Sequence, residues 1–153
     1  MKIEDVLDRY GDDLYRIGIS FMQNRSDAED AVQETLYKYM AKAPVFESEE
    51  HERHWLIRVM VNECRNIQRL RFRSVPLSTD DVPAFTEEDM HVMDTLRILP
   101  YKYREALLLH YSEGYPLKEI AEMLNISESA VKMRIHRGKK AFILAYGKEF
   151  GDE

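Results

Sequence analysis

Positively charged side chains gather in two short stretches of an otherwise acidic chain. Six arginines and one acid lie between Arg53 and Arg73, and five Lys or Arg residues and one acid lie between Ser127 and Lys140. The formal net charge of the chain is −6, but only the surface nearest the phosphates must be positive to bind a polyanion. The two stretches therefore suggest two separate contacts with a nucleic acid. For either stretch alone, a solvated helix face explains the charges equally well.

Residue types that could support catalysis are present but are not arranged for it. The paired acids Asp12-Asp13 and Glu87-Glu88 lie in segments that we expect to be solvated. The sequence contains no nucleophile–base pattern and no phosphate-binding loop. We therefore expect a binding protein that is not an enzyme.

The histidines and the cysteine do not indicate a metal site. His51, His54 and Cys64 follow no spacing used by standard zinc sites. Cys64 is the single cysteine, so an internal disulfide is impossible and a reducing cytoplasm fits best. No stretch approaches the roughly 18–20 apolar residues that cross a bilayer, and the first residues lack the layout of a secretion signal. We expect a cytoplasmic protein with no metal, no other cofactor and no membrane insertion.

The hydrophobic periodicity predicts an all-α fold, in which two small helical domains are joined by a flexible acidic linker. The linker is the segment 74–91, which holds Pro76 and Pro83, five acids and no Lys or Arg, and shows no helical periodicity. A loop of this length inside one compact domain would be unusual. The two domains are then residues 1–73 and 92–153.

Three or four helices are expected in the first domain. The second of them runs over about 27–41, with Ser26 as N-cap and Glu29 completing a capping box, and it ends before Pro44. A long helix follows over about 52–71. The first helix is indicated by apolar residues at helical spacing, namely Val6, Leu14, Ile17 and Phe21.

A helix-turn-helix is expected in the second domain, after two helices over 91–99 and 103–111. Pro116 occupies the first helical position of the motif, where its missing N–H costs nothing. Asn125 tolerates the left-handed backbone that a tight turn needs, and Ser127 is the N-cap of the next helix. The buried face of the first helix consists of Ile120, Ala121 and Leu124.

The helix that follows, from Glu128 to about Tyr146, has the pattern of a recognition helix that enters a major groove. At about 100° per residue, its inward face comprises Val131, Ile135, Gly138 and Phe142. The opposite, outward face includes His136. The residues expected to reach base edges are Glu128, Ser129, Lys132 and Met133. Those better placed for phosphates are Arg134, Arg137, Lys139 and Lys140.

Two blocks of the sequence resemble bacterial sigma factors of the extracytoplasmic-function (ECF) type. LPYKYREALLLHYSEGYPLKEIAEMLNISESAVKMRIHRGKKAF is similar to the family's C-terminal domain, which recognises the −35 promoter element. NRSDAEDAVQETLYKYM and HWLIRVMVNECRNIQRLRFR are similar to its polymerase-binding and −10-reading segments. The resemblance extends from about Tyr10 to Phe142. It implies a sigma factor that binds RNA polymerase core and directs promoter recognition and transcription initiation.

The resemblance also implies roles for individual residues of the first domain. The acidic helix that docks on the polymerase corresponds to Asp27, Asp30, Gln33 and Glu34. Asn62 matches the family's base-contacting asparagine in the pattern W-L-x-R-x-x-x-N, and Phe46 belongs to the loop that opens the −10 element. The phosphate contacts there correspond to Arg58, Arg65 and Arg69. The family's loop often carries a glycine or a basic residue after the phenylalanine, whereas Glu47-Ser-Glu-Glu is acidic, which argues against contact between this loop and the DNA backbone.

The partners implied by the resemblance are RNA polymerase core, promoter DNA and a cognate anti-sigma factor. An ordinary helix-turn-helix regulator that binds duplex operator without polymerase is the alternative. It would account for the segment 116–141 but leaves the arginine-rich helix and the DAEDAVQE segment unexplained.

Overall fold

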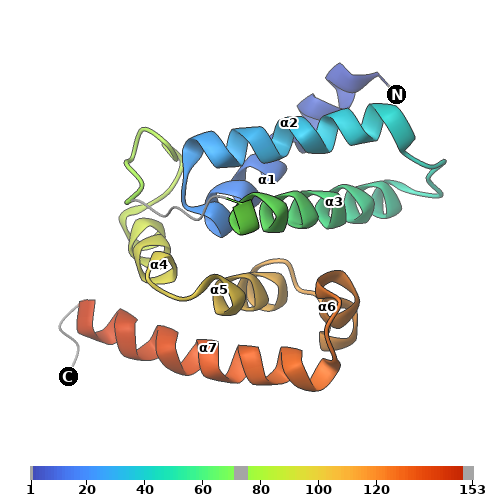
Figure 1. The fold of residues 1–153 in the computed structure, drawn as a ribbon. Coiled ribbons are helices and arrows are strands. Elements are labelled where there is room, and N and C mark those ends of the chain that lie inside the picture. Colours follow the sequence, from blue (N-terminus) through green and yellow to red (C-terminus); the bar gives the residue numbers. More distant parts are fainter. Residues whose placement is uncertain (1, 71–75, 150–153) are drawn as a thin grey trace. The chain divides into compact units, whose positions relative to one another are not determined.

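The computed structural model describes residues 2–70 and 76–149, and over these ranges the chain is helical with no β-strand (Figure 1). The all-α prediction is therefore confirmed. Contacts divide the chain into two compact units, which we call unit 1 (Met1–Ser74) and unit 2 (Val75–Glu153). Arg71 and Arg73, two arginines of the first basic stretch, lie outside the described residues. No helix in the described ranges is long and apolar enough to span a membrane.

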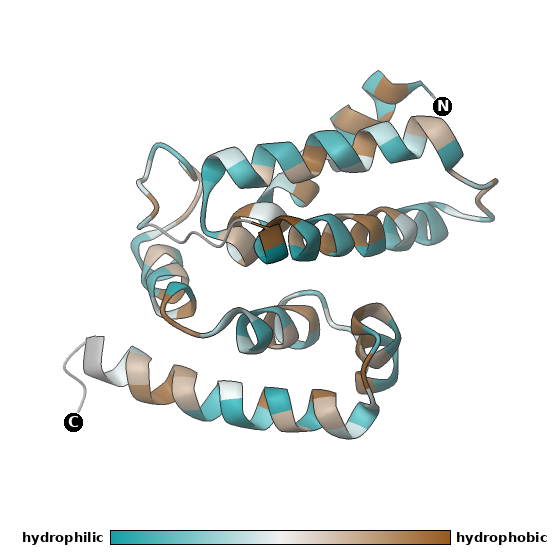
Figure 2. Ribbon diagram, viewed as in Figure 1, coloured by the Kyte–Doolittle hydropathy of each residue, from teal (hydrophilic) through white to brown (hydrophobic). Residues whose placement is uncertain are grey.

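Unit 1 is a bundle of three helices, α1 (Ile3–Met22), α2 (Arg25–Lys42) and α3 (Glu49–Leu70), in which each helix packs on the other two. Figure 2 shows apolar and polar residues alternating along these helices, as amphipathic packing requires. The predicted core positions of α1 are all buried. Gly18 allows the closest approach, because a Cβ there would lie 2.9 Å from both Ala28 Cβ and Met60 Cε.

Helix α2 begins two residues earlier than the sequence predicted. Asn24 is its N-cap and accepts a hydrogen bond from the backbone N–H of Asp27 at 2.9 Å. The prediction that Ser26 caps the helix is wrong. Gln23 adopts a left-handed backbone (φ 55°) that ends α1, so the first residue able to cap α2 is Asn24. At the other end, α2 stops at Lys42, before Pro44 as predicted.

Unit 2 contains α4 (Glu87–Arg97), α5 (Tyr101–Leu107) with a π-helical turn η1 (Leu108–Ser112), α6 (Leu117–Leu124) and α7 (Glu128–Glu149). Helix α4 starts inside the segment expected to be linker. Thr86 and Asp89 form a capping box there, in which the Asp89 N–H donates to Thr86 Oγ1 at 3.0 Å and the Thr86 N–H donates to Asp89 Oδ2 at 2.9 Å. Three of the five acids that suggested a solvated linker, Glu87, Glu88 and Asp89, thus form the first turn of a helix, where its dipole favours them.

Two contacts fix α5 within unit 2. Arg104 is 1% exposed, and its guanidinium donates to the carbonyl oxygens of Leu96 (2.9 Å) and Arg97 (3.0 Å), which lie at the end of α4. Burial lowers the pKa of Arg104 to about 10, so the side chain keeps its charge at neutral pH. Against α7, a Cβ on Gly138 would lie 3.0 Å from Tyr103 Cβ, so the two helices are in close contact at this point.

Candidate nucleic-acid and protein interfaces

Helix α2 presents an exposed acidic face to solvent. Asp30, Gln33 and Glu34 are all exposed, and Gln33 and Glu34 follow Asp30 by three and four residues, which places all three on one side of the helix. Asp30 and Glu34 are like charges at i,i+4, an arrangement that destabilises an isolated helix by about 0.2–0.5 kcal/mol. Asp27 is different, because its side chain is fully buried. The structure therefore brings three of the four expected polymerase-binding residues to one surface.

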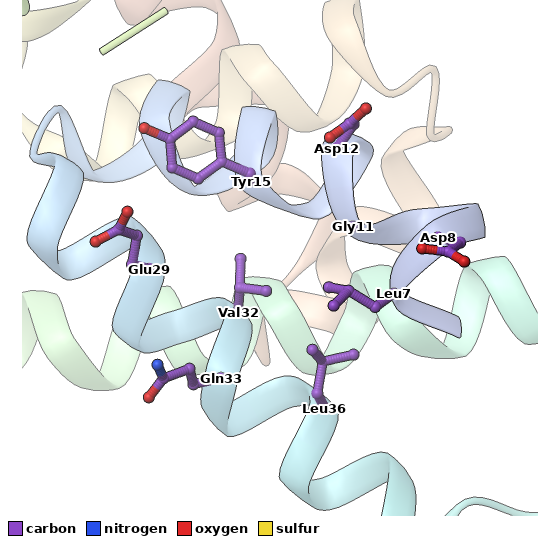
Figure 3. A pocket seen from close by; sticks show the side chains of 9 residues that line it. All are labelled: Leu7, Asp8, Gly11, Asp12, Tyr15, Glu29, Val32, Gln33 and Leu36. Atoms are coloured by element: carbon purple, nitrogen blue, oxygen red, sulfur yellow. The ribbon is translucent and has the colours of Figure 1, made fainter. Parts of the chain in front are cut away.

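A groove of about 730 Å³ lies between α1 and α2, beside this acidic face (Figure 3). Leu7, Val32 and Leu36 point into it, and Leu7 is 49% exposed although it is apolar. No Lys or Arg lines the groove. The other residues around it are mostly polar or acidic: Asp8, Gly11, Asp12, Tyr15, Glu29 and Gln33. A groove with apolar side chains flanked by carboxylates can bind a helix that carries both apolar and basic side chains.

Helix α3 carries a polar stripe opposite its buried face. Arg58, Asn62, Arg65 and Arg69 follow the spacing i, i+4, i+7, i+11, so they fall within an arc of about 60°. Arg58, Asn62 and Arg69 are exposed and Arg65 is half-buried. The structure thus brings the four expected −10 contacts of this helix onto one surface.

An aromatic cluster lies where the loop before α3 meets α2 and α3. The Phe46 ring stacks on the Tyr39 ring with centroids 6.0 Å apart, and Trp55 meets both rings edge-on at 5.9 and 6.0 Å. All three side chains are half-buried, so each keeps an accessible part. His51 completes the cluster, since its ring contacts Phe46 at 5.2 Å and its Nδ1 accepts from the Glu47 N–H. Half-exposed aromatic rings of this kind are the surfaces on which unstacked bases bind.

A buried carboxylate supports this cluster. Glu52 is 5% exposed and accepts hydrogen bonds from Tyr10 Oη at 2.9 Å and from Tyr39 Oη at 2.5 Å. Burial, and then the hydrogen bond to Glu52, raise the pKa of Tyr39 to about 12. The pKa of Tyr10 is raised for the same two reasons. Both phenols therefore stay protonated and keep donating at neutral pH.

Helices α6 and α7 are joined by a turn of three residues. Asn125 ends α6 in the left-handed region (φ 57°), and Ser127 Oγ accepts from the Ala130 N–H at 3.0 Å to cap α7. Both features were predicted, as was the burial of Ile120, Ala121 and Leu124. Pro116 lies one residue before the helix, as its N-cap, rather than at the first helical position.

The outward face of α7 is exposed as expected. Val131, Ile135 and Gly138 are buried on the inward side. The exposed residues are Glu128, Ser129, Lys132, Met133, His136, Arg137, Lys139 and Lys140. Arg134 is turned away from this face, because its Nη1 lies 3.9 Å from the buried Glu105 Oε1 on α5 and its side chain is only 27% exposed.

Sequence reasoning missed the groove, the Glu52 hydrogen bonds and the Arg134–Glu105 ion pair. Each depends on contacts between residues at least 13 positions apart. Leu7 was the one local signal for the groove, as an apolar residue on the side of α1 that faces away from the core.

Comparisons with known proteins agree with this arrangement. The family model "Sigma-70 region 2" matches residues 6–74 and "Sigma-70, region 4" matches residues 90–142. The chain is 30% identical over 160 residues to the ECF RNA polymerase sigma factor SigW of Bacillus subtilis (strain 168), covering 90% of this chain and 84% of that one. SigM of the same organism is 29% identical over 166 residues and is matched over 100% of both chains. The sigma factor RpoE of Bartonella quintana, solved with the anti-sigma factor NepR, shares the fold, with a TM-score of 0.72, 22% identity, and coverage of 93% of this chain and 94% of that one. The chain therefore belongs to the ECF sigma factors, which bind bacterial RNA polymerase and direct it to promoters.

Proposed function

We propose that unit 1 docks on the polymerase and captures the melted −10 strand, while unit 2 reads the −35 element as duplex DNA. The observation that carries this assignment is the presence of two exposed basic helix faces in separate units, with an acidic face beside the first. No bond is made or broken by the chain in this scheme. The chain acts in the bacterial cytoplasm, where the polymerase carries out RNA synthesis.

The proposed polymerase contact consists of the acidic face of α2 and the adjoining groove. Asp30, Gln33 and Glu34 would pair with basic side chains of a polymerase helix, and Leu7 would receive an apolar one. We leave Asp27 out of this contact because it is buried.

Two kinds of variant test the polymerase contact. Asp30→Asn with Glu34→Gln should weaken core binding by about 1–2 kcal/mol and flatten its salt dependence, because exposed charges act through screened attraction. Leu7→Ala should weaken binding without changing the salt dependence. Glu4→Gln, an exposed acid of α1 outside the groove, is the matched control. Unchanged core affinity in both test variants would reject the site.

The proposed −10 contact combines the α3 stripe with the aromatic cluster. Asn62 would read the edge of an unstacked base, Phe46 would stack on it, and the arginines would contact phosphates. The acidic side chains after Phe46 argue against a phosphate contact by the loop itself.

The proposed −35 contact is the outward face of α7, as a recognition helix in the major groove. Glu128, Ser129, Lys132 and Met133 would lie nearest the base edges, while His136 and the basic residues that follow would lie nearer the phosphates. Arg134 lies outside this proposed contact, because its pairing with Glu105 turns it towards α5.

In vitro transcription with core polymerase and a promoter library tests the whole assignment. We expect initiation at one class of promoter with defined −35 and −10 elements, and none from core alone. Specific operator binding by the isolated chain, unaffected by core polymerase, would instead support the regulator alternative.

A cognate anti-sigma factor is a further proposed partner, because the RpoE relative was solved with one. Such a protein should compete with core polymerase for the acidic face of α2. A purified partner that binds this chain and blocks its transcription would support the proposal, and simultaneous binding of partner and core without inhibition would contradict it.

A further inference from the structure

One buried carboxylate connects all three helices of unit 1. Glu52, on α3, accepts one hydrogen bond from Tyr10 of α1 and one from Tyr39 of α2, each on a different oxygen. With 5% exposure, the carboxylate has lost most of its water, which is costly unless its oxygens are paired. Apolar packing would hold three helices together at a lower desolvation cost.

Tyr39 links this carboxylate to the loop before α3. Its hydroxyl is held by Glu52, while its ring carries the Phe46 ring at 6.0 Å with an interplanar angle of 19°. The same ring contacts Trp55 edge-on at 6.0 Å. Anchoring the hydroxyl holds the far end of the ring's long axis in place, and the position of that ring determines where Phe46 can stack.

We propose that Glu52 is a positioning residue for strand capture: through Tyr10 and Tyr39 it holds the aromatic cluster in the shape that receives an unstacked base. The inference rests on the proposed function of the Phe46 loop in −10 recognition. Glu52 does not touch DNA in this scheme. It makes the capture surface rigid before the strand arrives, which lowers the ordering cost of binding.

Variants that change one polar group each can test the proposal in the full-length chain. Tyr39→Phe removes the anchored hydroxyl and keeps the ring, and Glu52→Gln keeps the shape and removes the charge. Tyr37→Phe, at a 63% exposed position on the same helix, is the control for the hydroxyl. Glu63→Gln is the control for the carboxylate, because Glu63 is also buried on α3 and pairs with Lys38 of α2, but it takes no part in the aromatic cluster.

Trp55 supplies the first measurement, because it is the only tryptophan of the chain and belongs to the cluster. We expect acrylamide quenching of its fluorescence to increase about twofold in Tyr39→Phe and Glu52→Gln, since a loosened cluster exposes the indole. Tyr37→Phe and Glu63→Gln should quench like the parent chain, even if Glu63→Gln lowers the melting temperature.

Open-complex formation supplies the second measurement, made with saturating core polymerase and permanganate detection of unpaired thymines. Tyr39→Phe and Glu52→Gln should each reduce strand opening about three- to tenfold, with core affinity unchanged. The double variant should be no worse than the more affected single variant, because both changes break one linkage. Phe46→Ala tests the underlying function of the loop directly.

The outcomes distinguish a failure of the proposed role of Glu52 from a failure of the proposed −10 function of the Phe46 loop. Normal opening in Phe46→Ala would overturn both. Reduced opening in Phe46→Ala with normal opening and quenching in Tyr39→Phe would overturn only the role of Glu52. Equal losses of opening in Glu52→Gln and Glu63→Gln would mark Glu52 as merely structural and also overturn it. If Glu52→Gln fails to fold, Tyr39→Phe decides the question, because it removes a single hydroxyl.

Discussion

Helices α3 and α7 both expose a basic face, but they are supported in different ways. The outward residues of α7 lie on a single helix, which α5 holds through the close contact at Gly138 and the Arg134–Glu105 ion pair. The surface around α3 is assembled from three helices and a loop, with Glu52 and Tyr39 beneath Phe46. One rigid helix is enough to read the edges of stacked base pairs in a groove. A base that has left the stack needs a pocket, and a pocket needs several elements.

The two surfaces also differ in charge. On α7 the exposed basic residues lie between Lys132 and Lys140, and the acid that precedes them, Glu128, lies in the first turn, where the helix dipole favours a negative charge. At α3 the arginine stripe is preceded by Glu47 in the loop and by Glu49 at the first position of the helix, and Glu49 pairs with Arg9 at 2.6 Å. Duplex phosphates are therefore attracted to residues 132–140 of α7 and to the arginine stripe of α3, but not to the acidic residues that precede that stripe.

The largest effects should come from filling the close helix contacts. Gly18→Ala would bring a methyl group within 3.0 Å of the backbone of Ala28, and Gly138→Ala would bring one equally close to Tyr103 Cβ. Neither neighbour is the end of a flexible side chain, so each variant should lower the free energy of unfolding by about 1–3 kcal/mol. Thermal unfolding followed by circular dichroism measures this loss of stability. The affinity for duplex DNA should fall in Gly138→Ala but not in Gly18→Ala.

Gly11→Ala provides the matched control for these substitutions. Its added methyl group would meet only the end of the Leu7 side chain, at 3.0 Å, and Leu7 is half exposed and can move. We expect a gain of up to about 1 kcal/mol from the better helix propensity of alanine. Equal destabilisation of Gly11→Ala and Gly18→Ala would contradict the assignment of close packing to Gly18.

Next in size is the pair Lys132→Ala and Asn62→Ala, which should separate duplex reading from strand capture. Lys132→Ala should weaken duplex binding by about 1–3 kcal/mol and reduce its salt dependence. Asn62→Ala should reduce strand opening roughly fivefold, since one lost hydrogen bond is worth about 1 kcal/mol. Filter binding to duplex promoter and permanganate footprinting measure the two effects. A loss of duplex affinity in Asn62→Ala equal to that in Lys132→Ala would remove the distinction between the two helices.

A smaller effect should appear at alkaline pH, in unit 1. The folded pKa of Tyr39 is about 12, above its ordinary value of 10.0, because the half-buried phenol is partly desolvated and its hydroxyl donates to Glu52. The folded state therefore favours the protonated phenol. This contribution to stability is complete below pH 10 and is lost as the pH rises towards 12. The free energy of unfolding, measured from pH 9 to 12, should fall as this contribution is lost. In Tyr39→Phe the free energy of unfolding should depend less on pH over the same range. An identical alkaline transition in both proteins would contradict the assignment.

Features of these helices that depend on neighbouring residues could be predicted from the sequence. The turn between α6 and α7 was predicted because Asn125 and Ser127 act locally, one through its backbone and the other through a cap three residues away. The outward residues of α7 followed from helical periodicity alone. The α3 residues were predicted from the resemblance to ECF sigma factors, and the structure shows that they repeat at helical spacing along one side of the helix.

The support beneath α3 could not be predicted, because it depends on pairs far apart in the sequence. Tyr10 and Glu52 are 42 residues apart, and nothing local to either residue distinguishes a buried glutamate from an exposed one. The error at the start of α2 has a local cause, since Asn24 and Ser26 are both good caps and the left-handed Gln23 decides between them. At α4, the acids of a helical first turn were mistaken for linker composition.

The smallest effect concerns the acidic segment 80–89, which ends in the first turn of α4 and which we expect to repel DNA from the free sigma factor. Asp81 accepts from the Ser78 N–H at 3.1 Å and Asp89 takes part in the α4 capping box, so these two acids have local structural roles. Neutralising Asp80, Glu87 and Glu88, which are exposed, leaves both caps in place. Removing three charges should raise the affinity of the isolated chain for duplex DNA about two- to fivefold at low salt and hardly at all at high salt. Fluorescence anisotropy at two salt concentrations measures this, with Glu122→Gln on α6 as a single-charge control. If the affinity for duplex DNA stayed the same at low salt, the segment would not restrain DNA binding. Any weak binding by the free subunit would then result from the acidic charge elsewhere in the chain.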